Sequence, residues 1–170
     1  MPMVKKEFLV SPELYNINEP IAGLGEIEKY NPQRFEMQQL TAIVYDNAED
    51  FTCVGYKDMT DSEFWVRGHM PGKPILPGVI ICEAAAQLAS YYCGKHAMVE
   101  GAMMGFAGLE DVKFRGLVRP GDRLIIQAKM LRMRKFLITA QFMALVGENI
   151  VAEGVIKGFP LSEELIQNEK

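Results

Sequence analysis

The sequence predicts an α+β domain in which a curved antiparallel sheet encloses one long buried helix. From Pro77 to about Cys93 the chain is apolar on nearly every side, which is typical of a helix buried all round. After residue 103 it returns to apolar runs and two-residue alternation, the pattern of strands. Short polar turns at Arg134-Lys135 and Gly147-Glu148-Asn149 join the last three candidate strands and favour an antiparallel meander. A helix without a polar face needs a surrounding surface, and a curved sheet supplies one.

The segments before the helix predict an arm followed by two strands. Residues 1–32 form the expected N-terminal arm, with a short helix near Ile21–Tyr30 that Asn31-Pro32 ends, because a residue before proline disfavours the helical conformation. Strands are expected over 35–46 and 51–58 around a polar turn, and Gly94 is the expected helix stop. The later strands are expected at Met103–Phe106, Lys113–Phe114, Leu124–Met133, Phe136–Val146 and Ile150–Gly158.

Composition predicts a single domain over residues 1–170, because 49% of the residues are hydrophobic and a real core is possible. The net charge of −4 does not favour nucleic-acid binding. No apolar run approaches the ~18 residues of a membrane-spanning helix, and no apolar core of a signal peptide follows Lys5-Lys6, so we expect a cytoplasmic protein. Cys53, Cys82 and Cys93 lack Cys-x-x-Cys spacing and are expected to be reduced core thiols.

Charge is distributed unevenly along the chain. Residues 1–63 carry twelve acidic and five basic side chains, whereas residues 111–135 carry eight basic and two acidic ones. A local basic strip can steer an acidic partner. The alternative is an ordinary hairpin whose charges face water.

The loop 68–78 contains three prolines, three glycines and His69, one of two histidines in the chain. Histidine is the usual residue for proton transfer near neutral pH. Each proline restricts one backbone dihedral, so the loop would present His69 rigidly. The alternative is a structural histidine. His96 follows Gly94 and is expected on the surface.

Glu83 lies inside the apolar helix, where a carboxylate is costly unless it is paired or protonated. Gln87, one turn further on, can hydrogen-bond it and hold its orientation. Alternatively, Glu83 lies near a helix end or an interface and reaches water. Gly78 begins the helix, where free backbone N–H groups would polarise a carbonyl oxygen. The alternative there is a plain Pro-Gly helix start.

A base, a buried acid and an oxyanion donor together point to removal of a proton beside a carbonyl group, with loss of oxygen from the next carbon. That reaction is elimination of water from a 3-hydroxyacyl compound. Sequence spacing does not by itself bring His69 to Glu83 in one chain, but a two-fold dimer can join them across its interface.

The stretch His69-Met70-Pro71-Gly72-Lys73-Pro74-Ile75-Leu76-Pro77-Gly78-Val79, with Glu83-Ala84 and Ala86-Gln87, resembles the signature of the 3-hydroxyacyl-[acyl-carrier-protein] dehydratases. These are hotdog-fold enzymes of fatty-acid synthesis. A second segment, Phe106-Ala107-Gly108-Leu109 through Asp122, also resembles the family. The resemblance covers most of residues 32–158 and implies the hotdog fold, a sheet wrapped around a central helix.

The resemblance implies specific roles. His69 matches the catalytic histidine, Glu83 matches a catalytic acid contributed by the partner subunit, and the Gly78 N–H matches the group that binds the thioester carbonyl. Glutamate at position 83, where some relatives have aspartate, points to a dehydratase without isomerase activity. Gln87 is expected to orient Glu83. No metal or redox cofactor is implied.

The resemblance also implies the partners. The substrate would be carried on the phosphopantetheine of acyl carrier protein, and the enzyme would be a homodimer, possibly a hexamer built as a trimer of dimers. We expect an acyl tunnel lined by Met70, Pro77, Val79, Met104 and Phe106. The basic residues expected to meet the acidic carrier are Lys113, Arg115, Arg119, Arg132, Arg134 and Lys135.

Several positions depart from the family pattern and indicate a specialised paralogue with an altered tunnel or partner. Met70 replaces a phenylalanine, and Met104 and Gly105 replace tyrosines near the tunnel mouth. Thr41 and Ala42 replace an aspartate and an arginine. Three other functions stay open: a hotdog acyl thioesterase, a non-catalytic acyl-carrier-binding subunit, and a role in a polyketide or unusual-lipid pathway.

Overall fold

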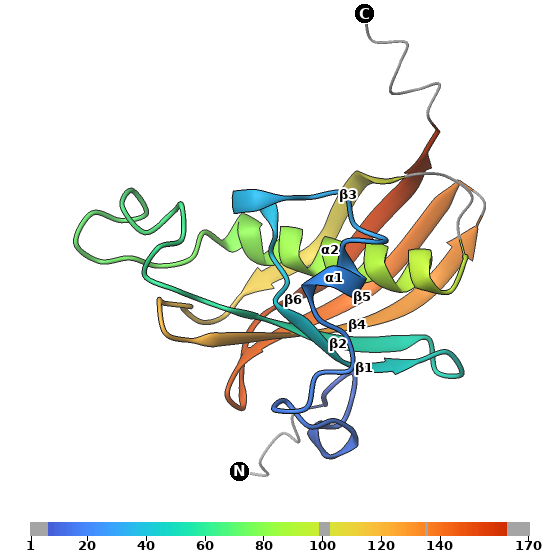
Figure 1. Cartoon of the computed structure of the whole chain (residues 1–170), viewed down its shortest axis with the longest axis horizontal. Helices are drawn as coiled ribbons and strands as arrows, with labels where there is room; N and C mark the ends of the chain where they lie inside the picture. Colours follow the sequence, from blue (N-terminus) through green and yellow to red (C-terminus); the bar gives the residue numbers. More distant parts are fainter. Residues whose placement is uncertain (1–6, 99–102, 135, 163–170) are drawn as a thin grey trace, which may run out of the picture.

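The computed structural model describes residues 7–98, 103–134 and 136–162. Within them, a six-stranded antiparallel sheet curves around one long helix, α2, which confirms the α+β hotdog architecture (Figure 1). The strands follow the order β1-β2-β4-β5-β6-β3. The elements are η1 Pro12–Leu14, α1 Leu24–Ile27, η2 Phe35–Met37, β1 Ala42–Asn47, β2 Thr52–Asp58, α2 Gly78–Lys95, β3 Met103–Phe114, β4 Arg123–Arg134, β5 Leu137–Val146 and β6 Asn149–Leu161.

The core lies between α2 and the concave face of the sheet. Leu88, Tyr91 and Tyr92 of α2 are fully buried. Alternate residues of the central strands β4 and β5 pack on the helix because side chains on a strand point to opposite faces in turn. These inward residues are Leu124, Ile126 and Ala128 of β4, and Ile138, Ala140, Phe142 and Ala144 of β5. Among the described residues, no helix is long and apolar enough to cross a membrane.

Two strand boundaries differ from expectation. The first strand begins at Ala42 instead of residue 35, because Phe35–Met37 form a 3-10 turn and backbone groups of Met37 and Gln39 bond the Gln87 side chain. The two short strands expected at 103–106 and 113–114 form one strand, β3. Register shifts at Phe106/Gly108 and Glu110/Lys113 absorb the residues between them. The N-terminal helix α1 is also shorter than the expected 21–30.

The expectation that Gly94 stops the helix is wrong, because α2 continues through Gly94 to Lys95. Ala97 adopts a positive φ of 50°, and its N–H donates to the Gly94 carbonyl at 3.1 Å, which closes the helix end. Gly94 serves packing instead. A Cβ atom on it would lie 3.1 Å from the Cβ of Tyr30, so a larger residue would crowd this contact.

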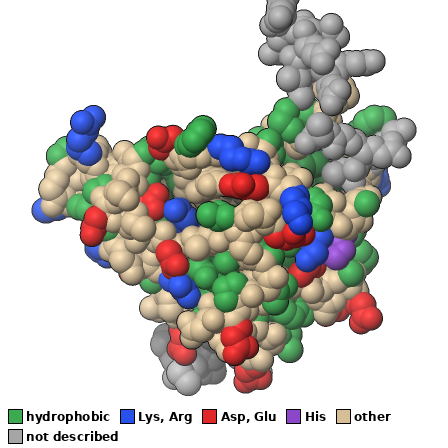
Figure 2. Space-filling view, in the orientation of Figure 1, with side chains coloured by type: hydrophobic (Ala, Val, Ile, Leu, Met, Phe, Trp, Pro, Cys, Tyr) green, Lys and Arg blue, Asp and Glu red, His purple; other side chains and the backbone are tan. Residues whose placement is uncertain are grey.

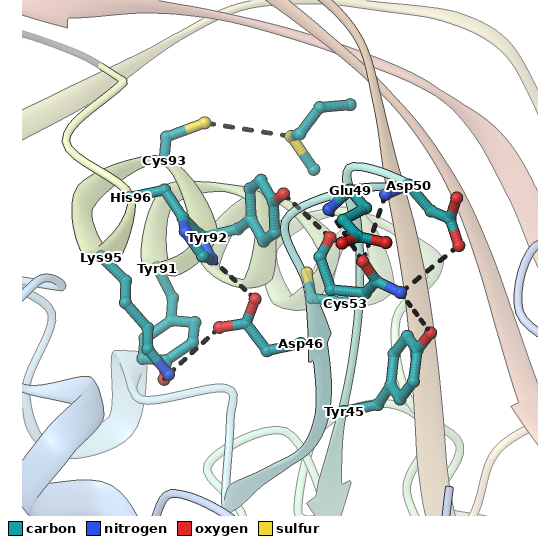
Figure 3. A network of polar contacts seen from close by, with 12 residues as sticks. Tyr45, Asp46, Glu49, Asp50, Cys53, Tyr91, Tyr92, Cys93, Lys95 and His96 are labelled. Atoms are coloured by element: carbon teal, nitrogen blue, oxygen red, sulfur yellow. Dashed lines mark hydrogen bonds and ion pairs between the residues drawn. The ribbon is translucent and has the colours of Figure 1, made fainter. Parts of the chain in front are cut away.

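His96 was expected on the surface, and its side chain is in part exposed, at 22%, but it also has a buried partner. Its Nε2 lies 2.7 Å from Oδ1 of Asp46, whose side chain is only 6% exposed. Lys95 Nζ lies 3.1 Å from the other oxygen of Asp46, and the His96 ring packs on Tyr92 (Figure 3). Sequence alone does not show that β1 places a carboxylate beside the end of α2. The cluster ties that helix end to the sheet.

The first part of the N-terminal arm, around Val10 to Ile17, packs on the face of the sheet opposite α2. Gln127 of β4 is fully buried there; its amide nitrogen donates to the Val10 carbonyl at 2.8 Å, and its oxygen accepts from the Val10 N–H at 3.1 Å. Arg123 also donates to the Ile17 carbonyl at 3.1 Å. The arm covers a second apolar cluster made of Val10, Ala42, Val44, Val54 and Tyr56.

The three cysteines are buried and unpaired, as expected. Burial raises the pKa of the Cys93 thiol to about 12, and it also raises the pKa values of the Cys53 and Cys82 thiols. Such thiols stay protonated near neutral pH and are poor nucleophiles.

Replacing Gln127 by methionine should release the arm. The substitution keeps the volume but leaves the Val10 N–H and carbonyl without partners, so we expect a loss of roughly 1–3 kcal/mol in the free energy of unfolding. Urea unfolding measures the loss, and limited proteolysis near Val10 detects the released arm. Gln141→Met on β5 is the control, because no hydrogen bond of the Gln141 side chain is seen in the described structure. Equal protease resistance in wild type and Gln127→Met would contradict the proposal.

The raised thiol pKa values predict a pH dependence. The Cys93 thiol has a pKa of about 12 in the folded state and ~8.5 in the unfolded state. Its contribution to the free energy of unfolding is complete below pH ~8.5, and it is lost as pH rises toward the folded value because the thiol of the unfolded chain ionises first. We expect unfolding free energies measured in urea to fall between roughly pH 8.5 and 10.5, and to fall less in Cys93→Ala. An identical slope in that variant would contradict the assignment. At pH 8, a disulfide reagent should modify the buried thiols of the folded protein slowly. In guanidinium, which unfolds the chain, it should modify all three thiols.

Candidate active site

The His69 loop extends beyond the N-terminal end of α2 (Figure 1). Backbone hydrogen bonds hold both sides of His69: its N–H donates to the Trp65 carbonyl, and its carbonyl accepts from the Ile75 N–H, each at 2.8 Å. Trp65 is buried in the core and anchors one side of the loop. On the other side, the Leu76 N–H donates to the Val118 carbonyl at 2.8 Å. His69 is therefore presented by a loop that is attached to the body at both ends.

The His69 ring is half-buried, and its Nδ1 lies 2.8 Å from the Ile75 carbonyl oxygen. A carbonyl oxygen only accepts hydrogen bonds, so Nδ1 carries the hydrogen in the neutral ring. The Nε2 lone pair is then available to take a proton. The loop thus sets the tautomer that a general base requires.

Glu83 lies on α2 and is half-buried. Gln87 donates from Nε2 to Glu83 Oε1 at 2.8 Å, which is the hydrogen bond that the sequence suggests. The Gln87 amide is itself held, because Nε2 also donates to the Met37 carbonyl at 2.6 Å and Oε1 accepts from the Gln39 N–H at 2.9 Å. Sequence reasoning missed these two partners because they are backbone groups in a segment interpreted as a strand.

A cavity of about 210 Å³ begins at Glu83 and runs along α2. Its helical wall is a stripe of mostly small residues, and β3, β5 and β6 form the opposite wall. The lining residues are Gln33, Glu83, Ala86, Ala89, Ser90, Cys93, Met104, Gly105, Phe106, Ile138, Ala140, Ile156, Lys157 and Gly158. Two of the five expected tunnel residues, Met104 and Phe106, belong to this wall. Met70, Pro77 and Val79 do not, and the Val79 side chain is 67% exposed.

His69 is not among the residues that line the Glu83 cavity. In the described chain, one edge of the sheet is open. Strand β3 is the last strand of the sheet on the side of β6, and Phe106, Leu109 and Phe114 on it are each more than 40% exposed. An edge strand with exposed apolar side chains is a surface on which a second copy can pair.

Gly78 is the first residue of α2, and no side chain caps this helix end. Backbone N–H groups there are open to an acceptor, and the helix dipole is positive. A Cβ atom at Gly78 would lie 2.8 Å from the ring of Phe114. Glycine therefore lets β3 approach the helix start closely.

The predicted basic residues separate into two groups in one chain. Lys113, Arg115 and Arg119 follow the end of β3 that pairs near Ala152, whereas Arg132 and Arg134 lie by the β4–β5 hairpin at the opposite end of the sheet. Arg115 pairs with Glu153 at 2.5 Å. Lys135 lies outside the described residues. On the face shown in Figure 2, positive and negative side chains are interspersed.

Within the described ranges, no three His, Cys, Asp or Glu side chains come together as metal ligands would. The site offers the His69 imidazole, whose Nε2 has no partner among the described residues, the Glu83 carboxyl group held by an amide, and the helix N-terminus at Gly78. Groups of these types can exchange protons and stabilise an anion.

Comparison with known proteins finds a family model and curated relatives that match most of the chain. The model of the FabA-like domain matches residues 31–155. The chain is 35% identical over 139 residues to the 3-hydroxyacyl-[acyl-carrier-protein] dehydratase FabZ of Caldanaerobacter subterraneus subsp. tengcongensis, covering 82% of this chain and 97% of that one. It is 36% identical over 136 residues to the FabZ of Caulobacter vibrioides, covering 76% and 82%.

Solved structures share the fold at low identity. The dehydratase heterocomplex ApeI:P from Xenorhabdus doucetiae matches with a TM-score of 0.71 and 15% identity, covering 82% of this chain and 93% of that one. The PaaI protein of the E. coli phenylacetic acid degradation operon matches with a TM-score of 0.54 and 15% identity, covering 69% and 80%. By its family model and its curated relatives, the chain belongs to the FabA-like family of 3-hydroxyacyl-[acyl-carrier-protein] dehydratases.

Proposed function

We propose that this protein removes water from a 3-hydroxyacyl thioester on acyl carrier protein, forming the trans-2-enoyl thioester in fatty-acid or related lipid synthesis. The observation that carries the proposal is the Gln87-held carboxyl of Glu83 at a cavity that extends along α2, in a chain 32–36% identical to the curated FabZ dehydratases. A cavity of this kind suits an acyl chain whose reacting end lies beside the acid.

Three groups of the site take part in the elimination of water. The Nε2 of His69 takes the proton from C2, and the electron pair of that C–H bond forms the new double bond. The C3–O bond breaks as protonated Glu83 gives its proton to the hydroxyl, so that water leaves. Negative charge on the thioester oxygen is stabilised by the Gly78 N–H and the helix dipole. Gln87 keeps the Glu83 carboxyl in one orientation.

Each site in this proposal needs two subunits. The cavity holds Glu83 without His69, and the exposed β3 edge offers a pairing surface for a second copy. A two-fold dimer gives two equal sites, each with the His69 of one subunit and the Glu83 of the other. A trimer of dimers would leave this arrangement unchanged.

The carrier protein would approach at the helix start, where its phosphopantetheine reaches Gly78. Lys113, Arg115 and Arg119 lie at that end of the sheet and are the basic residues best placed to meet it. In a dimer with two antiparallel β3 edges, Arg132 and Arg134 of the other subunit would lie toward the same end. We place the protein in the cytoplasm, where its unpaired thiols would stay reduced.

Replacing His69 or Glu83 by alanine should leave the fold intact and abolish catalysis. Both side chains lie outside the main core, and loss of a general acid or base costs roughly a hundredfold to ten-thousandfold in rate. Hydration of a trans-2-enoyl thioester, followed by its ultraviolet absorbance, measures the effect. Near-normal rates in either variant would remove that residue from the mechanism. Release of free thiol without hydration would indicate a thioesterase, and binding of loaded carrier without turnover would indicate a non-catalytic subunit.

Mixing the two inactive variants tests the shared site directly. A mixed dimer of His69→Ala and Glu83→Ala subunits contains one complete site, so unfolding and refolding an equal mixture should restore about a quarter of the wild-type activity per chain. If both groups came from the same chain, the mixture would stay inactive. Each variant refolded alone is the control.

A further inference from the structure

The wall of the Glu83 cavity carries polar groups that an ordinary saturated acyl chain would leave without partners. Ser90 lies in the middle of α2 with only 9% of its surface exposed, and it lines the cavity. A buried helical serine commonly bonds the carbonyl one turn before it. The Ser90 hydroxyl makes no such bond and no other hydrogen bond within the described residues.

Two further polar groups belong to the same cavity. Gln33 lines it and has a buried side-chain oxygen without a hydrogen-bond partner among the described residues, and Cys93 also lines it, with its thiol donating to Met130 Sδ at 3.9 Å. Gln33 is held in place by its backbone. Arg34 donates to the carbonyls of Asn31 and Gln33 at 2.7 and 2.8 Å, and the Asn31 amide donates to the Gln87 carbonyl of α2 at 2.9 Å.

Apart from the Gln33 oxygen, the fully buried side-chain atoms without hydrogen-bond partners in the described structure do not indicate a ligand here. Those of Asn31, Gln39 and Trp65 belong to residues outside the cavity wall, and that of Asp46 is in the ion pair with Lys95. Ser90 differs from these residues because it is nine-tenths buried, lines the cavity, and has no hydrogen-bond partner among the described residues. Uncompensated polar groups in a binding site favour a ligand that can bond them and reject one that cannot.

The helix sets the depth of Ser90. It lies seven residues beyond Glu83 on the same face of α2, a rise of about 10 Å, which an extended chain of roughly eight carbon–carbon bonds would span. If C3 of the substrate lies at Glu83, Ser90 faces the region near C11.

We propose that Ser90 is a specificity-determining residue and that the preferred substrate is a 3-hydroxyacyl thioester whose chain carries a second oxygen function, a hydroxyl or keto group, at the depth of Ser90. The inference rests on the proposed dehydratase function and names the class of acyl chain. Ser90 donates to that oxygen or accepts from its hydroxyl, while Ala86 and Ala89 leave room for the chain.

Matched substrates test the proposal. The dehydration of 3-hydroxydodecanoyl and 3,11-dihydroxydodecanoyl carrier proteins is compared by kcat/KM. Wild type should prefer the dihydroxy chain by roughly three- to tenfold, the effect of one neutral hydrogen bond. Ser90→Ala should abolish or reverse this preference and improve turnover of the plain chain. Alanine favours helix, so the variant is expected to fold, and urea unfolding checks this.

A second variant moves the polar group along the wall. Ala86 lies one turn closer to Glu83, so Ser90→Ala combined with Ala86→Ser should shift the preference by about 6 Å, from the 3,11- to the 3,7-dihydroxydodecanoyl chain. An unchanged substrate ratio in Ser90→Ala would overturn the inference while leaving the dehydratase proposal standing. If wild type dehydrates neither chain and His69→Ala changes nothing, the proposed function itself fails.

Discussion

The arrangement of the site depends on one buried amide, that of Gln87. Its side chain is 2% exposed and bonds three groups at once: the Glu83 carboxyl, the Met37 carbonyl and the Gln39 N–H. The Gln87 backbone carbonyl accepts a fourth bond, from Asn31. A single residue thus joins α2 to the segment 31–39 and orients the acid in the same step. Because each bond is shielded from water, losing the amide would leave several buried polar groups without partners.

That amide also explains the local departures from regular structure. Backbone groups of Met37 and Gln39 bond a side chain instead of a neighbouring strand, and so β1 begins only at Ala42. The result places Gln33 at the cavity wall, beside the Glu83 that Gln87 holds. The segment before β1 is therefore part of the site, although its sequence alone suggests ordinary sheet.

Residues whose roles follow from chemistry and spacing could be predicted from the sequence. The buried helix, the meander of β4 to β6, and the bond between Glu83 and Gln87 are of this kind, because periodicity and helical geometry determine them. Roles that depend on which segments meet could not be predicted. From the sequence, Gly94 is interpreted as a helix stop, whereas the structure shows that it packs against Tyr30. His96 is interpreted as a surface residue, whereas β1 places Asp46 beside it. The basic residues look continuous in sequence, yet antiparallel pairing separates them to opposite ends of the sheet.

The proposed division of the site between two chains is consistent with the same geometry. A helix enclosed by a sheet leaves its N-terminal end and the β3 edge uncovered, and Val79, Phe106 and Phe114 are exposed there. Backbone hydrogen bonds tie both ends of the loop to the body, and His69 on that loop is not among the residues that line the Glu83 cavity of its own chain. In the proposed dimer, the rigid loop holds His69 in place for the Glu83 cavity of the other subunit. The stiffness of the loop and the exposure of β3 both suit that proposal, in which the acid and the base are each positioned by a separate copy of the fold and the interface completes the site.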